Sequence, residues 1–282
     1  VAASHVYPRI GRVLVSDLTT RRVQAWIDAL DESGLAASTV INANVILRGA
    51  CADLVRMDEL QRNPAVGVRL PTRKKTRTNT WTTEQIAAVF KSARKLRPVM
   101  ETFYRVALTT GMRPGEIRAL MWSDIDFESG VITCQRTITR GKKFRPVIGE
   151  TTKTHKARTI AVPASTIQAL RAHRTSQLET QVASTRWEPT GLVFTRDDGN
   201  LLAQQTLHNW HTVVCKAAGV PRIRLHDLRH SAATILLQHG VHPKVVSEIL
   251  GHASITTTLD IYSHVDVSMQ RAATDILGEI AE

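Results

Sequence analysis

The stretch TGMRPGEIRAL, residues 110–120, separates a helical part of the chain from the part where strands are predicted. Gly111 is placed to end a helix over 98–110, because glycine is favoured just beyond a helix C-terminus. Pro114 suits the first position of a new short helix, since its missing N–H has no partner there in any case. The stretch therefore predicts a sharp corner between two helices.

Arg113 falls at this corner, at the predicted N-terminus of the short helix. Free backbone N–H groups favour an anion at such a place, and a guanidinium matches two phosphate oxygens. The structural alternative is that Arg113 only pairs with Glu116 or Glu101, and the stretch by itself leaves both readings open.

Downstream, the pattern changes to strands and then back to helix. Short runs rich in β-branched residues, separated by Gly, Lys and Thr, predict strands at Val131–Thr137, Phe144–Ile148 and Arg158–Val162. Helical spacing returns over 164–183, and the chain after about residue 202 reads as helical to its end.

Upstream, the first 70 or so residues are predicted to be helical. Val23, Trp26, Ile27 and Leu30 recur at helical spacing behind the possible caps Asp17 and Thr19.

A second upstream helix should begin at Ser38 or Thr39 and carry the apolar residues Val40, Ile41, Val45, Leu47 and Leu54. Another helix should follow Trp81, where Thr82 and Gln85 form a capping box.

Between these parts, residues 69–77 read RLPTRKKTR and carry no acid. This composition favours an exposed linker that either contacts a phosphate backbone or is simply solvated. The predicted fold is mainly α with a small antiparallel β-sheet. It comprises a helical domain over 1–70, a linker over 71–80 and an α+β domain over 81–282. The candidate phosphate-backbone contacts of the linker are Arg69, Arg73, Lys74, Lys75 and Arg77.

Composition points to a polyanionic partner. Lys and Arg number 37 against 25 acidic residues, a net charge of +12, which favours nucleic acid over a merely cationic protein. No apolar run reaches the ~20 residues of a membrane span. Cys51, Cys134 and Cys215 lie far apart, so neither a disulfide framework nor a zinc site is indicated, and a cytoplasmic location is expected.

Two further stretches contain candidate catalytic residues. In LHDLRHSAATILL, residues 225–237, His226 and Arg229 lie three apart and share one side of a helix. Such a pair can bind one phosphoryl group, although an ordinary helix with a polar start would read the same way.

In LGHASITTTLDIYSHV, residues 250–265, His252 precedes Tyr262. A tyrosine near a helix end is usually buried, and its pKa near 10 makes it a poor nucleophile unless cations surround the target phosphate. Lys153, in TTKTHKAR, is a candidate cation between two predicted strands, and Lys156 and Arg158 lie close to it in the same stretch.

Together these motifs resemble one known family. TGMRPGE, TKTHKAR, HDLRH, LGH and a tyrosine followed by SHV, in this order, resemble the tyrosine recombinases, also called the phage integrase family. YPRIG, WIDALDESGLAASTV and NPAVGVRLP resemble that family's core-site DNA-binding domain, so the resemblance covers essentially the whole chain.

The resemblance implies roles for particular residues. Tyr262 would be the nucleophile, Arg113 and Arg229 would hold the scissile phosphate, and Lys153 would be the general acid for the departing 5′ oxygen. The supporting roles are those of His226, which assists proton transfer or holds the phosphate, His252, which donates to a non-bridging oxygen, and Glu116, which anchors Arg113.

The resemblance also implies an activity and its partners. The chain would be the integrase or transposase of a mobile element. It would cut and rejoin double-stranded DNA through a 3′-phosphotyrosine and a Holliday junction, without cofactor, metal or ATP. It would be a monomer when free and a tetramer on DNA, assisted by directionality or bending proteins, and associated with a bacterial nucleoid. Because the chain begins at Val1, we expect it to be part of a longer integrase.

Other functions fit parts of the pattern. A type IB topoisomerase uses the same nucleophilic chemistry, and a non-catalytic DNA-binding regulator fits the charge and the helices. A metal-dependent nuclease would use the histidines as ligands. The regulator would not need the ordered set of Arg, Lys, His and Tyr, so the sequence favours the recombinase.

Overall fold

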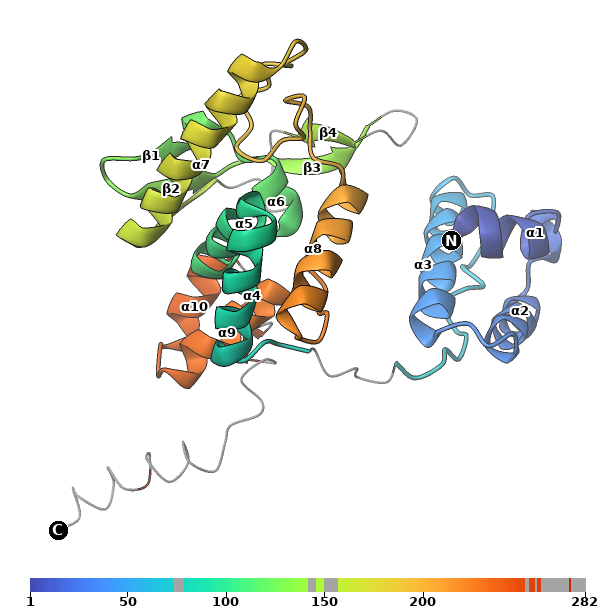
Figure 1. Cartoon of the computed structure of the whole chain (residues 1–282). Coiled ribbons are helices and arrows are strands. Elements are labelled where there is room, and N and C mark those ends of the chain that lie inside the picture. The colour runs from blue at the N-terminus through green and yellow to red at the C-terminus, as the bar shows by residue number, and fades with distance from the viewer. Residues whose placement is uncertain are drawn as a thin grey trace. The chain divides into compact units, whose positions relative to one another are not determined.

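The computed structural model describes residues 1–73, 79–141, 146–149, 157–251, 254–256, 258–259 and 274. The chain divides into two compact units, Val1–Arg77 and Thr78–Glu282, and each is described by itself (Figure 1). Within the described residues no helix is long and apolar enough to cross a membrane.

The first unit is helical. A π-turn over Ala2–Val6 and a 3-10 turn over Val15–Asp17 accompany its helices, which are α1 (Tyr7–Ile10), α2 (Thr20–Glu32) and α3 (Ala37–Arg56). Helix α2 is capped as predicted by Thr19, whose hydroxyl accepts from the backbone N–H of Arg22. The apolar face predicted for it is confirmed, because Val23, Trp26, Ile27 and Leu30 are all buried.

Helix α3 differs from the prediction at its start. It begins at Ala37, with Ala36 before it and no side-chain cap, so the start at Ser38 or Thr39 is wrong. Val45 is 58% exposed, whereas the polar Asn44 is buried and its amide donates to the carbonyl of Ala65. A buried polar side chain with a backbone partner is compatible with a core, and Val40 and Leu47 are buried on the same helix.

The ends of the linker are held in place by hydrogen bonds. Gln24 of α2 accepts from the backbone N–H of Arg69 at 2.7 Å and donates to its carbonyl at 3.2 Å. The main chain at residue 69 therefore belongs to the first unit. At the other end, the indole of Trp81 donates to the carbonyl of Pro221 and its backbone N–H donates to Ser231 Oγ.

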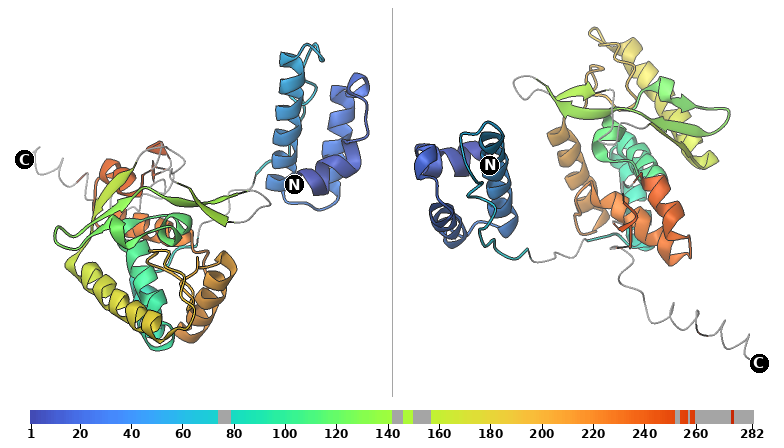
Figure 2. Two further views of the ribbon diagram at one scale, coloured as in Figure 1. Left: turned by 90° about the horizontal axis from the view of Figure 1, so that it is seen from above. Right: turned by 180° about the vertical axis from the view of Figure 1, so that it is seen from behind.

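The second unit is a helical bundle with two small antiparallel sheets at one end of it (Figures 1 and 2). Its helices are α4 (Thr83–Leu96), α5 (Pro98–Thr110), α6 (Pro114–Arg118), α7 (Ala164–Ala183), α8 (Gln204–Ala218), α9 (Asp227–Gln238) and α10 (Pro243–Leu250). Its strands are β1 (Ile125–Asp126), β2 (Val131–Cys134), β3 (Thr137–Arg140), β4 (Pro146–Gly149) and β5 (Arg158–Ala161).

The strands form two sheets rather than one. Strands β1, β2 and β5 make a three-stranded sheet, and β3 and β4 make a separate hairpin. The single strand predicted over Val131–Thr137 is broken because Gln135 and Arg136 both turn their side chains to the buried carboxylate of Asp124. The mainly helical fold with small antiparallel sheets is confirmed, and only the division of the strands is corrected.

Helix α5 lies at the centre of the second unit's core. Its Met100, Phe103, Tyr104 and Val106 are buried to within 1% of their surface, and it packs against α4, α7 and α9. The predicted bounds of α5, of α7 and the capping box of Thr82 and Gln85 are confirmed. The last residues of α5 lead directly into the candidate site.

Candidate active site

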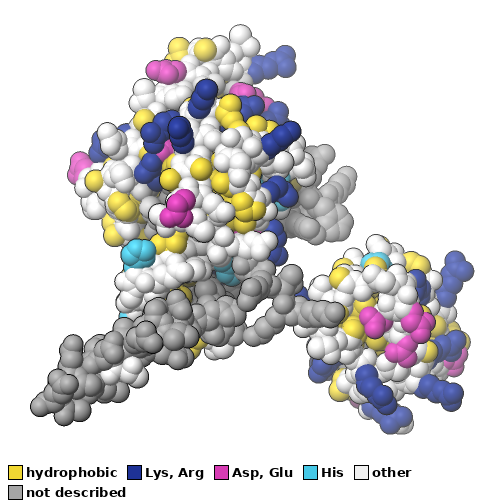
Figure 3. Space-filling model, turned by 60° about the horizontal axis from the view of Figure 1, so that its bottom comes forward, with side chains coloured by type: hydrophobic (Ala, Val, Ile, Leu, Met, Phe, Trp, Pro, Cys, Tyr) yellow, Lys and Arg dark blue, Asp and Glu magenta, His cyan; other side chains and the backbone are white. Residues whose placement is uncertain are grey.

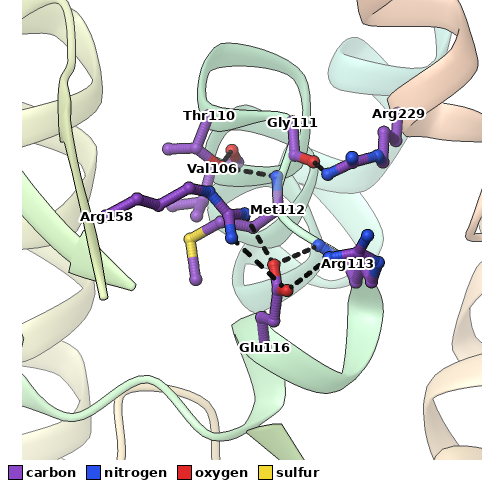
Figure 4. A network of polar contacts seen from close by, with 8 residues as sticks. All are labelled: Val106, Thr110, Gly111, Met112, Arg113, Glu116, Arg158 and Arg229. Carbon is purple, nitrogen blue, oxygen red and sulfur yellow. Dashed lines mark hydrogen bonds and ion pairs between the residues drawn. The ribbon is translucent and has the colours of Figure 1, made fainter. Parts of the chain in front are cut away.

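Glu116 is the centre of the candidate site and is only 2% exposed. Its Oε1 accepts from Arg113 Nη1 at 2.9 Å, and its Oε2 accepts from the backbone N–H of Arg113, also at 2.9 Å. Oε2 also accepts from Arg158 Nη2 at 2.7 Å, so one carboxylate joins two guanidiniums (Figure 4). The N–H of Arg113, predicted to be free for an anion, is therefore already paired.

The two arginines determine the protonation of Glu116. Burial alone would raise the pKa of this carboxyl, but the hydrogen bond and charge of Arg158, and then the hydrogen bonds of Arg113, lower it to about 2. Glu116 is consequently a fixed anion, unsuited to exchanging protons near neutral pH.

This shift predicts an acid-sensitive contribution to stability. Because the folded pKa of about 2 lies below the ordinary value of 4.5, the unfolded chain takes up the proton first as pH falls. As the pH falls from 6 to 3, protonation of this carboxyl in the unfolded chain should lower the free energy of unfolding by about 2 kcal/mol. Glu116→Gln should remove that part of the pH dependence, measured by urea unfolding at both values.

The matched control for this prediction is Glu179→Gln, which changes an exposed carboxylate on α7. The control should lose as much stability on acidification as the unaltered protein. Equal losses in Glu116→Gln and Glu179→Gln would contradict the prediction.

Arg229, from α9, is the most deeply buried guanidinium of the site, at 3% exposure. Its Nη1 donates to the carbonyl of Gly111 at 2.8 Å, while its Nη2 is buried without any described hydrogen-bond partner. Burial, and next the charge of Arg113, lower the pKa of Arg229 to about 9. A buried N–H without an acceptor is costly, so this corner favours an incoming anion.

The charges at this corner do not balance among the described residues. The charges of Arg113 and Arg158 both lower the pKa of Arg229, and Glu116 is the carboxylate that pairs with Arg113 and Arg158. Three cations against one anion leave room for the negative charge of a phosphate.

Gly111 shapes the support under Arg229. It adopts φ +59° at the end of α5, and a Cβ there would lie 2.2 Å from Leu250 Cδ2. Leu250, at the end of α10, is fully buried, so its side chain would have to shift within the core to admit that atom. The tight approach of α10 to α5 thus requires glycine at this position.

Gly111→Ala is expected to destabilise the second unit more than an ordinary helix-ending glycine would. The left-handed backbone costs about 1–2 kcal/mol for alanine, and the overlap with Leu250 adds about 1–3 kcal/mol. Gly219→Ala is the matched control, because Gly219 ends α8 at φ +65° with no atom within 4 Å of its would-be Cβ. Thermal unfolding of both variants tests this, and an equal loss in both would contradict it.

His226 lies at the start of α9, one residue before its first turn, and its side chain is only partly exposed. Its ring stands 5.4 Å from that of His230, edge to face. Partial burial, followed by the charges of His230 and Arg229, lowers its pKa. A neutral imidazole is favoured, which can accept a proton or donate a single hydrogen bond.

Asp227 and Ser231 hold the start of α9 in place. The buried carboxylate of Asp227 accepts from Arg224 Nε and Nη2, each at 2.9 Å. Ser231 Oγ donates to the carbonyl of Asp227 and accepts from the N–H of Trp81. These hydrogen bonds therefore hold in place the start of α9, where His226 and Arg229 lie.

His211 of α8 is a second supporting residue, and it was not predicted from the sequence. This fully buried imidazole bonds the hydroxyl of Tyr104 at 2.8 Å through Nδ1 and the carbonyl of Ile223 at 2.8 Å through Nε2. Burial lowers its pKa to about 4, so it stays neutral. Its spacing from Leu207 and Val214 places it on the buried face of α8, a signal that was present in the sequence.

Several predicted site residues lie outside the described residues. These are Lys153, His252 and Tyr262, together with the linker residues Lys74, Lys75 and Arg77. Most of the chain after residue 259, which was predicted to be helical, also falls there. Arg69 and Arg73 are described and exposed, and Lys and Arg side chains are spread over the face of each unit drawn in Figure 3.

Metal ligands do not cluster in the described part of the chain. No group of three or more His, Cys, Asp or Glu side chains there is placed to hold a metal ion. The site as described is thus a set of guanidiniums with one anchoring carboxylate and a neutral imidazole, which is suited to binding a phosphate.

Known proteins resemble this chain over most of its length. A model of the phage integrase family matches residues 79–269. A tyrosine recombinase XerC-like protein of Caldanaerobacter subterraneus subsp. tengcongensis is 29% identical over 94% of this chain and 72% of its own length. The ICEBs1 integrase of Bacillus subtilis is 28% identical over the same shares.

Solved structures share the fold. An integrase of the Tn1549 transposon, in complex with transposon right end DNA, superimposes with a TM-score of 0.79 at 21% identity, over 96% of this chain and 89% of that one. A lambda integrase dimer bound to a core site gives 0.68 at 17% identity, over 90% and 84%.

Proposed function

The chain belongs to the phage integrase family and is thus a tyrosine recombinase that cuts and rejoins DNA, and we propose that it does so as the site-specific integrase of a mobile element. The similarity to the ICEBs1 integrase and to the Tn1549 transposon integrase supports the mobile-element role.

The main observation behind the assignment of the site is a cluster of guanidinium groups whose positive charge exceeds the negative charge of the described carboxylate beside them. Arg229 is 3% exposed and keeps a buried Nη2 without a described partner, and Arg113 is held beside it by Glu116. A DNA phosphodiester has the charge and the oxygen acceptors that this cluster lacks. We therefore place the scissile phosphate between Arg113 and Arg229.

The proposed reaction is transesterification. The Tyr262 oxygen attacks phosphorus, and the bond from phosphorus to the 5′ oxygen breaks. The products are a 3′-phosphotyrosine and a free 5′-hydroxyl. A 5′-hydroxyl from the partner strand then attacks the same phosphorus and releases Tyr262, so no net bond energy is lost and no ATP is required.

The guanidiniums act where charge develops in this reaction. The phosphorus passes through a pentacoordinate arrangement with added negative charge, and preorganised donors aimed at that charge usually give the largest catalytic contribution. Arg229 is preorganised by Gly111 and Arg113 by Glu116.

Proton transfer is assigned to the remaining predicted residues. We propose that Lys153 protonates the departing 5′ oxygen and that His226, neutral near pH 7, receives or steers the proton of Tyr262. His252 is proposed to donate to a non-bridging oxygen. These three roles follow from the resemblance to the family.

The proposed assembly follows from the same resemblance. The helical domain and the catalytic domain would bind opposite faces of the duplex, joined by the linker over 71–80 with Arg69, Arg73, Lys74, Lys75 and Arg77 near the backbone. Four protomers would act on two sites through a Holliday junction in the bacterial cytoplasm, with accessory directionality or bending proteins.

Strand exchange at one specific DNA sequence distinguishes this function from the relaxation of supercoiled DNA without sequence specificity. The protein is incubated in EDTA with a pool of DNA fragments, and the DNA in SDS-stable complexes is sequenced. The proposal expects one enriched sequence, free 5′-hydroxyl ends, and joint molecules when two copies of that sequence are supplied. Equal capture of all sequences together with plasmid relaxation would instead identify a topoisomerase.

A further inference from the structure

Arg158 is a third arginine of the site, and the catalytic roles described above do not use it. It is the first residue of β5 and pairs with Cys134 of β2 in the three-stranded sheet. Its side chain is 15% exposed, and its Nη2 bonds Glu116 Oε2 at 2.7 Å. The sheet thus fixes the backbone of a guanidinium that reaches into the cluster (Figure 4).

The same side chain supports a second part of the chain. Gly251 ends α10 at φ +64°, and a Cβ there would lie 3.0 Å from Arg158 Cδ, 3.1 Å from Nε and 3.2 Å from Cζ. The main chain that leads to His252 therefore lies directly against the Arg158 side chain. Only glycine combines this backbone conformation with such a close approach.

Packing alone does not explain an arginine at this position. Its Nε is buried and has no described hydrogen-bond partner, which costs free energy that an apolar side chain of similar length would avoid. Among the described residues, the hydrogen-bond partner of the polar end of this side chain is Glu116, which also holds Arg113.

We propose that Arg158 is a positioning residue for DNA cutting: it fixes Glu116, and through it Arg113, while its side chain seats the Gly251 turn that precedes His252. It thereby sets the spacing between two groups that act on one phosphate. The proposal rests on the proposed function, since it needs Arg113 to contact the scissile phosphate.

Arg158→Gln and Arg158→Lys test the proposal in the full chain. At saturating DNA, Arg158→Gln should slow formation of the covalent complex about 10- to 100-fold, the size typical for partners that orient a catalytic group. The DNA dissociation constant should stay within about twofold, because Arg158 does not contact DNA in this account. Arg158→Lys keeps a cation for Glu116 and should recover part of the rate.

A double-mutant cycle isolates the contact with Gly251. Gly251→Ala should slow the unaltered protein, and it should add little further loss in Arg158→Gln, where the neighbouring side chain is smaller. Gly219→Ala, with the same backbone conformation but open space around it, should leave both rates unchanged.

The outcomes separate this inference from the proposed function. A slow Arg113→Lys together with an unaffected Arg158→Gln would overturn the inference and leave the function intact. Full activity in both variants would overturn the proposed site itself. A loss of DNA affinity equal to the loss of rate in Arg158→Gln, or additive losses with Gly251→Ala, would also overturn the positioning role.

Discussion

Tyr262→Phe is expected to reduce covalent attachment to DNA by at least ~10⁴-fold, below detection in an SDS gel, because loss of a nucleophile removes the reaction path itself. DNA affinity should remain within about twofold, since the phenyl ring is retained and the guanidinium cluster is unchanged. Measurement of the two quantities on the same DNA fragment separates binding from chemistry.

Tyr7→Phe is the matched control for this variant. Tyr7 is 65% exposed in the first unit, so removal of its hydroxyl should leave the rate of covalent attachment at saturating DNA unchanged. Tyr104 is unsuitable as a control because its hydroxyl bonds the buried His211. Unreduced covalent attachment in Tyr262→Phe would overturn the assignment of the nucleophile.

Arg229→Lys is expected to slow cutting about 10²- to 10³-fold at saturating DNA, the range found when one preorganised donor to a developing charge is removed. Arg229 uses Nη1 for the carbonyl of Gly111 and keeps Nη2 without a described partner. Lysine retains the charge but lacks the planar fork, so it cannot bond the carbonyl and a phosphate oxygen in the same geometry.

Arg186→Lys provides the matched control, because Arg186 is an exposed arginine of the second unit. The control should cut at the rate of the unaltered protein, and both variants should unfold at similar temperatures. An Arg229→Lys variant that cuts at full rate would remove Arg229 from the site. If Arg229→Lys only weakened DNA binding and cut at full rate at saturating DNA, Arg229 would be a contact to the DNA backbone and not a catalytic residue.

Helix positions were largely predictable, because they depend on local chemistry. Thr19 and Thr82 cap helices α2 and α4 as their sequences predict, and Gly111 ends α5. The misplaced details depend on contacts distant in sequence. The strand ends before Gln135, whose side chain donates to the carboxylate of Asp124. No local sequence pattern predicts that contact.

The same distinction applies to the site. Arg113, His226 and Arg229 stood in recognisable motifs, and the structure brings Arg113 close enough to Arg229 for its charge to lower the pKa of Arg229. Arg158 could not be assigned from sequence, since its link to Glu116 spans 42 positions and its support of Gly251 spans many more. Among many basic residues, a single arginine becomes distinctive only through its contacts.

The most direct test of the central claim identifies the amino acid that becomes joined to DNA. The covalent complex formed on the enriched sequence is digested with nuclease and protease, and the peptide that retains a nucleotide is located by mass spectrometry. We predict one adduct, a phosphate ester on Tyr262, with a free 5′-hydroxyl on the released strand. An adduct on any other residue, or cut DNA with no protein-bound phosphate, would contradict the account.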